Sequence, residues 1–174
     1  MPAACAIQAG YTIDCRESIG GLQAVFIAEF GNITSVAEVS GLVTGITKAT
    51  GKKFFKFEIP RAVANATSNG TGSEENGSFF FTHQVVFPIN KRDSTTANII
   101  RVLAKNKCIV VTLDMDGNYR MYGKGNGLFV STVDSGSGTA AGDRQGYNIT
   151  LTGIEKDEML QVNSTTGLAL ETAG

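Results

Sequence analysis

The sequence predicts a mainly β domain, and three observations indicate it. Glycine occupies 21 of the 174 positions, whereas proline occupies only three, and the chain is 42% hydrophobic. This composition is typical of a β protein with many turns rather than of a disordered or fibrous chain. Short apolar runs recur between turn signals along most of the sequence. The length suits one domain with a substantial core.

The charges are almost balanced, with 15 Lys and Arg against 16 Asp and Glu. Acidic and basic residues are also balanced within each half, which argues against strong general attraction to nucleic acid or to a membrane surface. No apolar run approaches the ~20 residues that cross a bilayer. Residues 1–18 lack both a basic start and an apolar signal stretch. We therefore expect a protein made in the cytoplasm.

Four strands are predicted in the first third of the chain. They cover 22–30, 36–39, 42–47 and 52–59. The fourth strand stops at Pro60 and contains Phe54 and Phe55, which must face opposite sides because they are adjacent. Since this strand is apolar on both faces, it needs cover on both, from a helix, a second sheet or another chain.

A polar stretch and an aromatic stretch follow. Residues 65–77 contain one apolar side chain and three glycines, which indicates a long exposed loop or flexible arm. Residues 78–89 form a strand that begins with Phe79, Phe80 and Phe81. Because 53–63 and 78–89 flank the polar stretch, the sequence predicts a long antiparallel hairpin over 52–89 that carries an arm at 64–78.

One helix is predicted after Asp93 and Ser94, which can cap its start. Apolar residues recur at helical spacing from Ala97 to Ala104, and Arg101 and Lys105 fall on the opposite face. Further strands are predicted at 108–115, 119–122, 128–133 and 147–154, with a loose stretch at 134–145 and a frayed end at 165–174. In total we expect about eight strands and one helix. The domain covers 19–160, between an N-terminal extension at 1–18 and a C-terminal tail at 161–174.

The cysteines do not indicate a disulfide framework. Cys108 lies in an apolar strand, where a thiol usually fills a core position. A bridge between Cys5 and Cys15 is conceivable, but the sequence shows no secretory context for it.

The sequence offers little for catalysis. His83 is the one histidine, so a three-His zinc site is excluded and a Ser-His-Asp triad would have to use it. It lies between Phe81 and Val85 on the same strand face, without an acidic neighbour in sequence. A buried or interface histidine explains this placement better than a catalytic one.

Two loops are candidate ligand sites. Asp114–Asn118 starts like a calcium loop, but its glycine is at the fourth position and Gly125 replaces the terminal Glu, so a hairpin turn explains it. The glycines at 123, 125 and 127 lie between predicted strands, which is not the setting of a phosphate cradle. Glu155, Asp157 and Glu158 are interpreted as a solvated strand end. We predict no catalytic, cofactor-binding or metal-binding residue, and no enzyme.

The remaining signal is one of assembly. The two aromatic segments are apolar on both faces, and one short helix cannot cover both faces of so long a hairpin. Exposed edge strands pair with other chains unless they are blocked, and head-to-tail contacts generate rings. Two alternatives stay open. One is an ordinary β-sandwich core; the other is single-stranded nucleic-acid binding by the lysines and Arg61 around Phe54, Phe55 and Phe57.

The order of these features resembles the tail tube proteins of bacteriophages and the related head–tail joining rings, particularly those of crAss-like and other phages of Bacteroidetes hosts. The resemblance covers about residues 19–158. The motifs that carry it are Gly20–Ile27, Gly51–Glu58, Asn76–Thr82, the helix, Asp116–Gly123, Asn126–Leu128, Gly142–Asp143 and Gly146–Tyr147 through Gly153–Glu155.

The resemblance implies a tail-tube-like β-sandwich or barrel with one flanking helix and a long hairpin arm. Copies would join into a homo-oligomeric ring, contact adjacent tail or connector proteins, and enclose a conduit through which double-stranded DNA passes transiently. The expected location is the virion tail, without cofactor or membrane. The predicted inter-subunit residues are Phe54, Phe55, Phe57, Asn69, Glu74, Glu75, Phe79, Phe80, Phe81, Arg101 and Lys105.

Three other functions remain open at this point. The chain could form a single collar or connector ring at the head–tail junction, or a tube like that of type VI secretion. The third candidate is a carbohydrate- or peptide-binding β-sandwich module, which would use Tyr119, Tyr122 and Tyr147 as an exposed platform.

Overall fold

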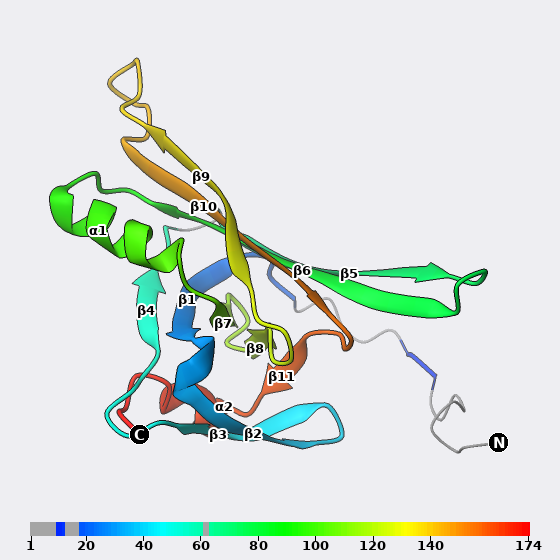
Figure 1. Ribbon diagram of the computed structural model, residues 1–174. Coiled ribbons are helices and arrows are strands. Elements are labelled where there is room, and N and C mark those ends of the chain that lie inside the picture. The colour runs from blue at the N-terminus through cyan, green and yellow to red at the C-terminus, as the bar shows by residue number, and fades with distance from the viewer. Residues whose placement is uncertain (1–9, 13–17, 61–62) are drawn as a thin grey trace.

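The computed structural model describes residues 10–12, 18–60 and 63–174, and shows two β-sheets with two α-helices (Figure 1). The predicted mainly β class is confirmed. Cys5 and Cys15, between which a bridge is conceivable but not indicated by the sequence, lie outside the described residues. In the described residues, no helix is both long and apolar enough to cross a membrane.

The larger sheet has seven strands in the order β2-β3-β11-β8-β7-β1-β4. Its strands are β1 (Leu22–Glu29), β2 (Ile33–Val39), β3 (Leu42–Lys48), β4 (Phe55–Glu58), β7 (Cys108–Asp114), β8 (Tyr119–Tyr122) and β11 (Leu160–Val162). A short 3-10 turn, η2 (Phe30–Asn32), joins β1 to β2. The predicted strands at 22–30, 36–39, 42–47, 108–115 and 119–122 are confirmed within a few residues.

The smaller sheet has four strands in the order β5-β6-β10-β9. They are β5 (Asn65–Ser73), β6 (Ser78–Ile89), β9 (Phe129–Gly136) and β10 (Gly146–Glu155). The pairing of β6 with β10 ends at Phe81, opposite Glu155, and in the part of the chain that the structure describes residues 78–80 of β6 pair with β5 alone. The end of the β5–β6 hairpin therefore projects away from the rest of the molecule (Figure 1). We call residues 70–81 of this hairpin the arm.

Two apolar cores lie on opposite faces of β1 and β7. Val25, Ile27 and Val110 face the smaller sheet and helix α1, and Phe87 and Leu151 close that core from the other side. On the opposite face, a second core is closed by β3, β11, the C-terminal segment and Phe54; its members include Phe26, Val111, Val43, Val162 and Leu170. Because both faces are covered, β1 is buried at almost every position, as a two-sided strand must be.

Helix α1 (Ser94–Leu103) begins where the sequence predicts. The backbone N–H of Thr96 donates to Asp93 Oδ1 at 2.8 Å, which is an N-cap hydrogen bond. An ion pair with Lys91, at 2.8 Å, and the Thr96 hydrogen bond hold the pKa of Asp93 below its usual range. The buried face of α1 carries Ile100 and Leu103, which pack against the first core.

The structure corrects the predicted loop at 65–77. Residues 65–73 are strand β5, paired with β6 along its whole length, and only four residues make the turn. The glycines explain how a strand so poor in apolar residues is held. A Cβ at Gly70 or Gly72 would lie 2.8 or 2.7 Å from the ring of Phe79, so this ring lies across the glycine backbone.

The predicted pairing of 53–63 with 78–89 is wrong as well. Strand β4 pairs with β1, with Phe57 opposite Val25 and Phe55 opposite Ile27. The long hairpin is therefore formed by 65–89, and the segment at 52–59 belongs to the other sheet. The short distance in sequence suggested that 53–63 pairs with 78–89. In the structure β4 pairs with β1 instead, because both strands have apolar side chains to bury.

The predicted frayed end is also corrected. Residues after Val162 form helix α2 (Ser164–Leu168), and Leu170 is 1% exposed within the second core. The Lys48 ammonium donates to the carbonyls of Ala169 and Thr172 at 2.8 and 2.6 Å, and the Phe54 N–H donates to the Leu170 carbonyl at 3.1 Å. The C-terminal segment is thus part of the domain.

Substitution of Leu170 tests this placement. Leu170→Ala is expected to lower the free energy of unfolding by about 2–4 kcal/mol, because it leaves a cavity in the second core. Leu168 is 77% exposed two residues earlier, so Leu168→Ala is the matched control, with an expected change below about 0.5 kcal/mol. Urea unfolding followed by circular dichroism measures both; equal effects would contradict a docked C-terminus.

Candidate assembly surface

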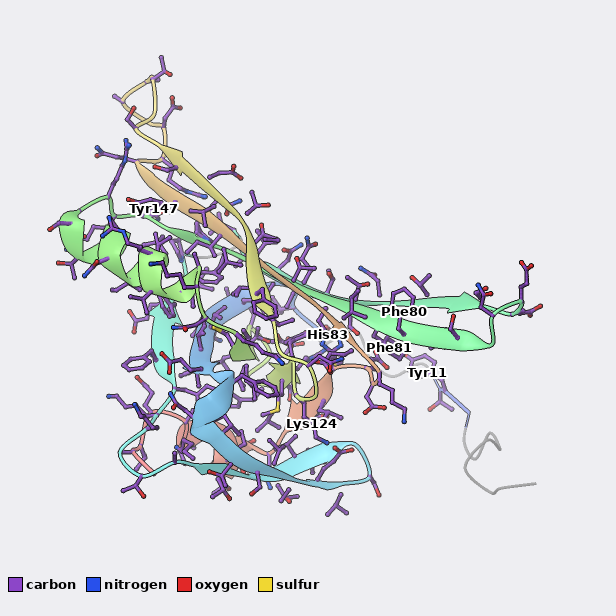
Figure 2. All side chains as sticks on the ribbon, in the orientation of Figure 1. Tyr11, Phe80, Phe81, His83, Lys124 and Tyr147 are labelled. Atoms are coloured by element: carbon purple, nitrogen blue, oxygen red, sulfur yellow. The ribbon has the colours of Figure 1, made fainter. Side chains whose placement is uncertain are left out.

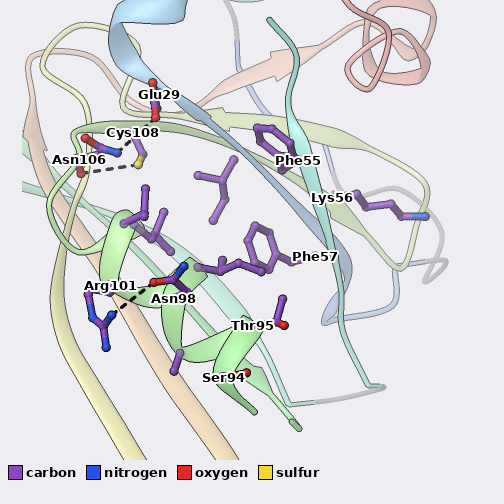
Figure 3. Close-up of a pocket in the computed structure, with 15 residues that line it drawn as sticks. Glu29, Phe55, Lys56, Phe57, Ser94, Thr95, Asn98, Arg101, Asn106 and Cys108 are labelled. Carbon is purple, nitrogen blue, oxygen red and sulfur yellow. Dashed lines mark hydrogen bonds between the residues drawn. The ribbon is translucent and has the colours of Figure 1, made fainter. Parts of the chain in front are cut away.

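An open groove of about 960 Å³ lies between helix α1 and strand β4 (Figure 3). We call it the α1–β4 groove. Its floor is formed by Ile27, Phe57, Leu103 and Cys108. The Phe57 ring packs against the Phe87 ring, with ring centroids 5.6 Å apart. Burial raises the pKa of the Cys108 thiol to about 11, so this cysteine is an unreactive part of the groove floor.

The walls of the α1–β4 groove expose large apolar side chains. Phe55 on β4 is 62% exposed, and Ile99 and Val102 on α1 are 45% and 53% exposed. These three side chains line one groove, which makes them a patch rather than scattered surface residues. Sequence reasoning placed Ile99 and Val102 on the apolar face of α1 but not in a binding surface. Two adjacent apolar pairs, Ile99-Ile100 and Val102-Leu103, could have indicated this surface. They make the apolar stripe of α1 wider than the face that packs against the core.

Strand β4 is also an open sheet edge. Among the described residues it is the last strand of the seven-stranded sheet and pairs with β1 alone. The Ile59 N–H donates to the Gln23 carbonyl at 3.2 Å, and hydrogen-bonded pairs alternate along an antiparallel ladder. The main-chain groups of Phe55 and Phe57 therefore face β1, while those of Lys56 and Glu58 face outward. Such an edge can accept a further strand.

The arm is the second exposed apolar surface. Phe79 is 62% exposed and meets Phe81 edge-on, with ring centroids 5.2 Å apart. Phe80 lies on the other face of β6 and is half-buried. Asn69 is exposed at the base of the arm, and Glu74 and Glu75 are exposed at its turn.

The two surfaces differ in charge and lie at opposite ends of the molecule. Residues 65–89 contain Glu74 and Glu75 but no Lys or Arg. The α1–β4 groove is lined by Lys56 and Arg101 as well as by Glu29, and Lys105 follows just beyond the end of α1, so the basic residues outnumber the acidic one there. Arg101 and Lys105 are both exposed. The arm projects from one end of the fold while α1 lies at the other, so the arm does not reach the α1–β4 groove of its own chain (Figure 1).

The predicted interface residues therefore fall into three sets. Phe54 is fully buried in the second core and is no part of any surface. The structure places Phe55, Phe57 and Arg101 together at the groove, with Lys105 just beyond the end of the helix. The remaining predicted residues lie on the β5–β6 hairpin: Asn69, Glu74, Glu75, Phe79, Phe80 and Phe81.

The tyrosine platform of the carbohydrate-binding alternative is not formed. Tyr119 and Tyr122 are 8% and 4% exposed, and Tyr147 packs against the first core. Burial, the largest cause, raises the pKa of Tyr122 to about 12. These side chains cannot present an aromatic surface to a sugar.

The glycine-rich turn at 123–127 holds a carboxylate of the chain itself. The N–H groups of Asn126 and Gly127 donate to Glu155 Oε1 at 2.8 and 3.0 Å, and that of Gly125 donates to Oε2 at 3.1 Å. Glu155 is 5% exposed, so the prediction of a solvated strand end is wrong for this residue. Since the turn joins β8 of the larger sheet to β9 of the smaller one, Glu155 on β10 fastens the two sheets together.

Removal of this carboxylate is expected to destabilise the fold. Glu155→Ala leaves three backbone donors without their acceptor, and the expected loss is about 2–4 kcal/mol in the free energy of unfolding. Glu158→Ala removes an exposed carboxylate three residues away and serves as the control, with a change below about 0.5 kcal/mol. Chemical denaturation measures the free energy of unfolding of both variants. A loss below about 0.5 kcal/mol for Glu155→Ala would contradict the role of the carboxylate.

His83 lies beside the same turn (Figure 2). Its ring is 2% exposed, its Nδ1 accepts from the Gly123 N–H at 3.3 Å, and it meets the Tyr122 ring edge-on at 5.4 Å. Within the described residues, Nε2 has no hydrogen-bond partner. Burial lowers the pKa of His83, against smaller opposing effects of Glu155, of the Asp157 backbone and of Glu158.

The aspartates of the predicted β7–β8 turn bind other groups of the same chain. Asp114 forms an ion pair with Arg120 at 2.7 Å, and Asp116 accepts from the Ile19 N–H at 2.7 Å. The turn itself is confirmed.

Comparison with known proteins found no matching family model, no similar curated protein and no similar solved structure.

Proposed function

We propose that this protein is a non-enzymatic structural subunit that assembles head to tail with copies of itself into rings. The observation that carries the proposal is the separation of two complementary surfaces. The arm, acidic at its turn and apolar at Phe79, projects from one end, and the apolar α1–β4 groove, with Arg101 beside it, lies at the other. Contacts between different surfaces of identical subunits generate closed rings, or filaments when the rotation does not close.

The contact places apolar against apolar and acid against base. Phe79 of one copy would pack against Phe55, Ile99 and Val102 of the next. Glu74 and Glu75 would face Arg101 and Lys105 around this apolar centre. An aromatic anchor surrounded by charged residues is the usual anatomy of a specific protein interface.

The biological role follows from the resemblance to phage tail tube and head–tail ring proteins. In that role the rings form a conduit in the tail or neck of a virion, through which double-stranded DNA passes. The near-neutral net charge supports this role, because a strongly basic lumen would hold the DNA.

Negative-stain electron microscopy of the purified full chain tests the proposal. Rings with a central channel are expected, and stacked rings would favour a tube over a single collar. A protein that stays monomeric at all concentrations would contradict the proposal.

A further inference from the structure

We propose that His83 is a pH-dependent latch, which on taking up a proton releases the turn at 123–127 and loosens the base of the arm. The latch is an equilibrium within one chain. Only its consequence for assembly rests on the proposed function.

The hydrogen bond from Gly123 defines the latched form. Because Nδ1 of His83 accepts from the Gly123 N–H, Nδ1 carries no proton and the neutral ring has its proton on Nε2. A second proton would go to Nδ1, where it would point at the Gly123 N–H. Two donors would then face each other at 3.3 Å in a buried site, so the protonated ring and this turn are incompatible.

Burial of the ring and the facing Gly123 N–H oppose protonation of His83 while the latch is closed, and burial outweighs the nearby acidic side chains, which favour protonation. The ring is buried against Tyr122 of β8, and the strand residues opposite it are Ser68 on β5 and Gly153 on β10. The charged groups around it are Glu155, whose carboxylate is held by the turn, and Glu158, which is exposed. Lys124 in the same turn is ion-paired with Glu38.

Release reverses this balance. Once Gly123 moves away, water can reach the ring and the imidazolium no longer faces a donor. The released form thus binds the proton more tightly than the closed form, and acid favours release.

The position of His83 connects the latch to the arm. His83 is the buried residue of β6 nearest to the arm, since residues 78–82 are exposed or half-buried. β6 loses its pairing with β10 just beyond it, after Phe81. Loosening the contact at His83 therefore frees the point where the arm leaves the body (Figure 2).

Hydrogen–deuterium exchange of the full chain tests the latch. If the released form has an ordinary His pKa of about 6.5 and the closed form binds no proton, the opening constant rises about tenfold between about pH 7.5 and about pH 5.5. After correction for intrinsic exchange, the amides at 123–127 should exchange about tenfold faster at the lower pH. In His83→Gln, which cannot take up a proton, this increase should disappear. An equal increase in wild type and variant would overturn the proposal.

A second measurement remains decisive if His83→Gln fails to fold. His83 is the one histidine of the chain, so its 15N signals need no residue assignment, and correlations with Cγ and Cδ2 distinguish Nδ1 from Nε2, in solution for a monomer or by magic-angle spinning for a particle. The proposal requires a proton on Nε2 and none on Nδ1 at neutral pH. A proton on Nδ1 would overturn it. Both measurements report on the chain whether or not it assembles. Sedimentation can therefore contradict the proposed function while the latch stands, and these measurements can contradict the latch while the proposed function stands.

Discussion

Shortening the hairpin arm is expected to yield a folded monomer that no longer assembles. In this variant Asn69 is joined to Thr82 through an Asn-Gly turn in place of residues 70–81, which preserves the register of the remaining ladder. The arm contributes little to the core, because Phe79 is mostly exposed and β6 is buried only from His83 onward. Its loss should therefore cost little stability while removing one of the two complementary surfaces.

Sedimentation velocity and thermal unfolding together measure this effect. The shortened chain should sediment as a monomer and unfold cooperatively near the wild-type temperature. Deletion of 66–76 is a poor substitute, because it removes most of β5 and leaves β6 without its neighbour. A shortened chain that assembles as well as wild type would show that the arm is no part of the contact.

A charge in the α1–β4 groove is expected to weaken assembly to a similar extent. Val102→Glu places a carboxylate on the groove wall, where it would be buried against the arm of the next copy. Loss of a central anchor typically costs 2 kcal/mol or more, so the association constant should fall by at least about 30-fold. Since Val102 is 53% exposed in the single chain, the free energy of unfolding should change by less than about 0.5 kcal/mol.

Leu168→Glu is the matched control for the groove variant. Leu168 is an exposed leucine on α2, outside the α1–β4 groove, so the same change of apolar residue to glutamate should leave association intact. Equal weakening by both substitutions would indicate a general effect of charge and would contradict the groove contact.

Charge reversal tests the pairing of the two surfaces directly. Arg101→Glu with Lys105→Glu should weaken association about tenfold, and Glu74→Lys with Glu75→Lys should do the same. All four changes in one chain should restore most of the affinity, because the pairs are then re-formed with opposite sign. Simple addition of the two losses would contradict contact between these residues.

The elements that the sequence predicted are those with a local signal. Helix α1 has a capping aspartate and helical spacing, and β7–β8 has an Asp-Gly turn between apolar runs. Strand β5 lacked such a signal, because it consists almost entirely of Thr, Ser, Asn and Gly and has no alternating apolar residues. It is held by pairing with β6 and by the Phe79 ring across Gly70 and Gly72.

The exposure of the aromatic residues was only partly predictable. Phe54 and Phe55 face opposite sides, as expected from their adjacency, but one is completely buried and the other is 62% exposed. The difference arises from the C-terminal segment, which docks over Phe54 more than a hundred positions later in the chain. No local pattern distinguishes the covered face from the uncovered one.

We propose that copies of this chain cover each other's arm and α1–β4 groove. Sedimentation velocity of the full chain at neutral pH, over a wide concentration range, is the decisive experiment. As the concentration rises, we expect a discrete species of fixed copy number to increase while the 18.3 kDa monomer decreases. Sedimentation as a monomer at every concentration would show that the copies do not cover each other.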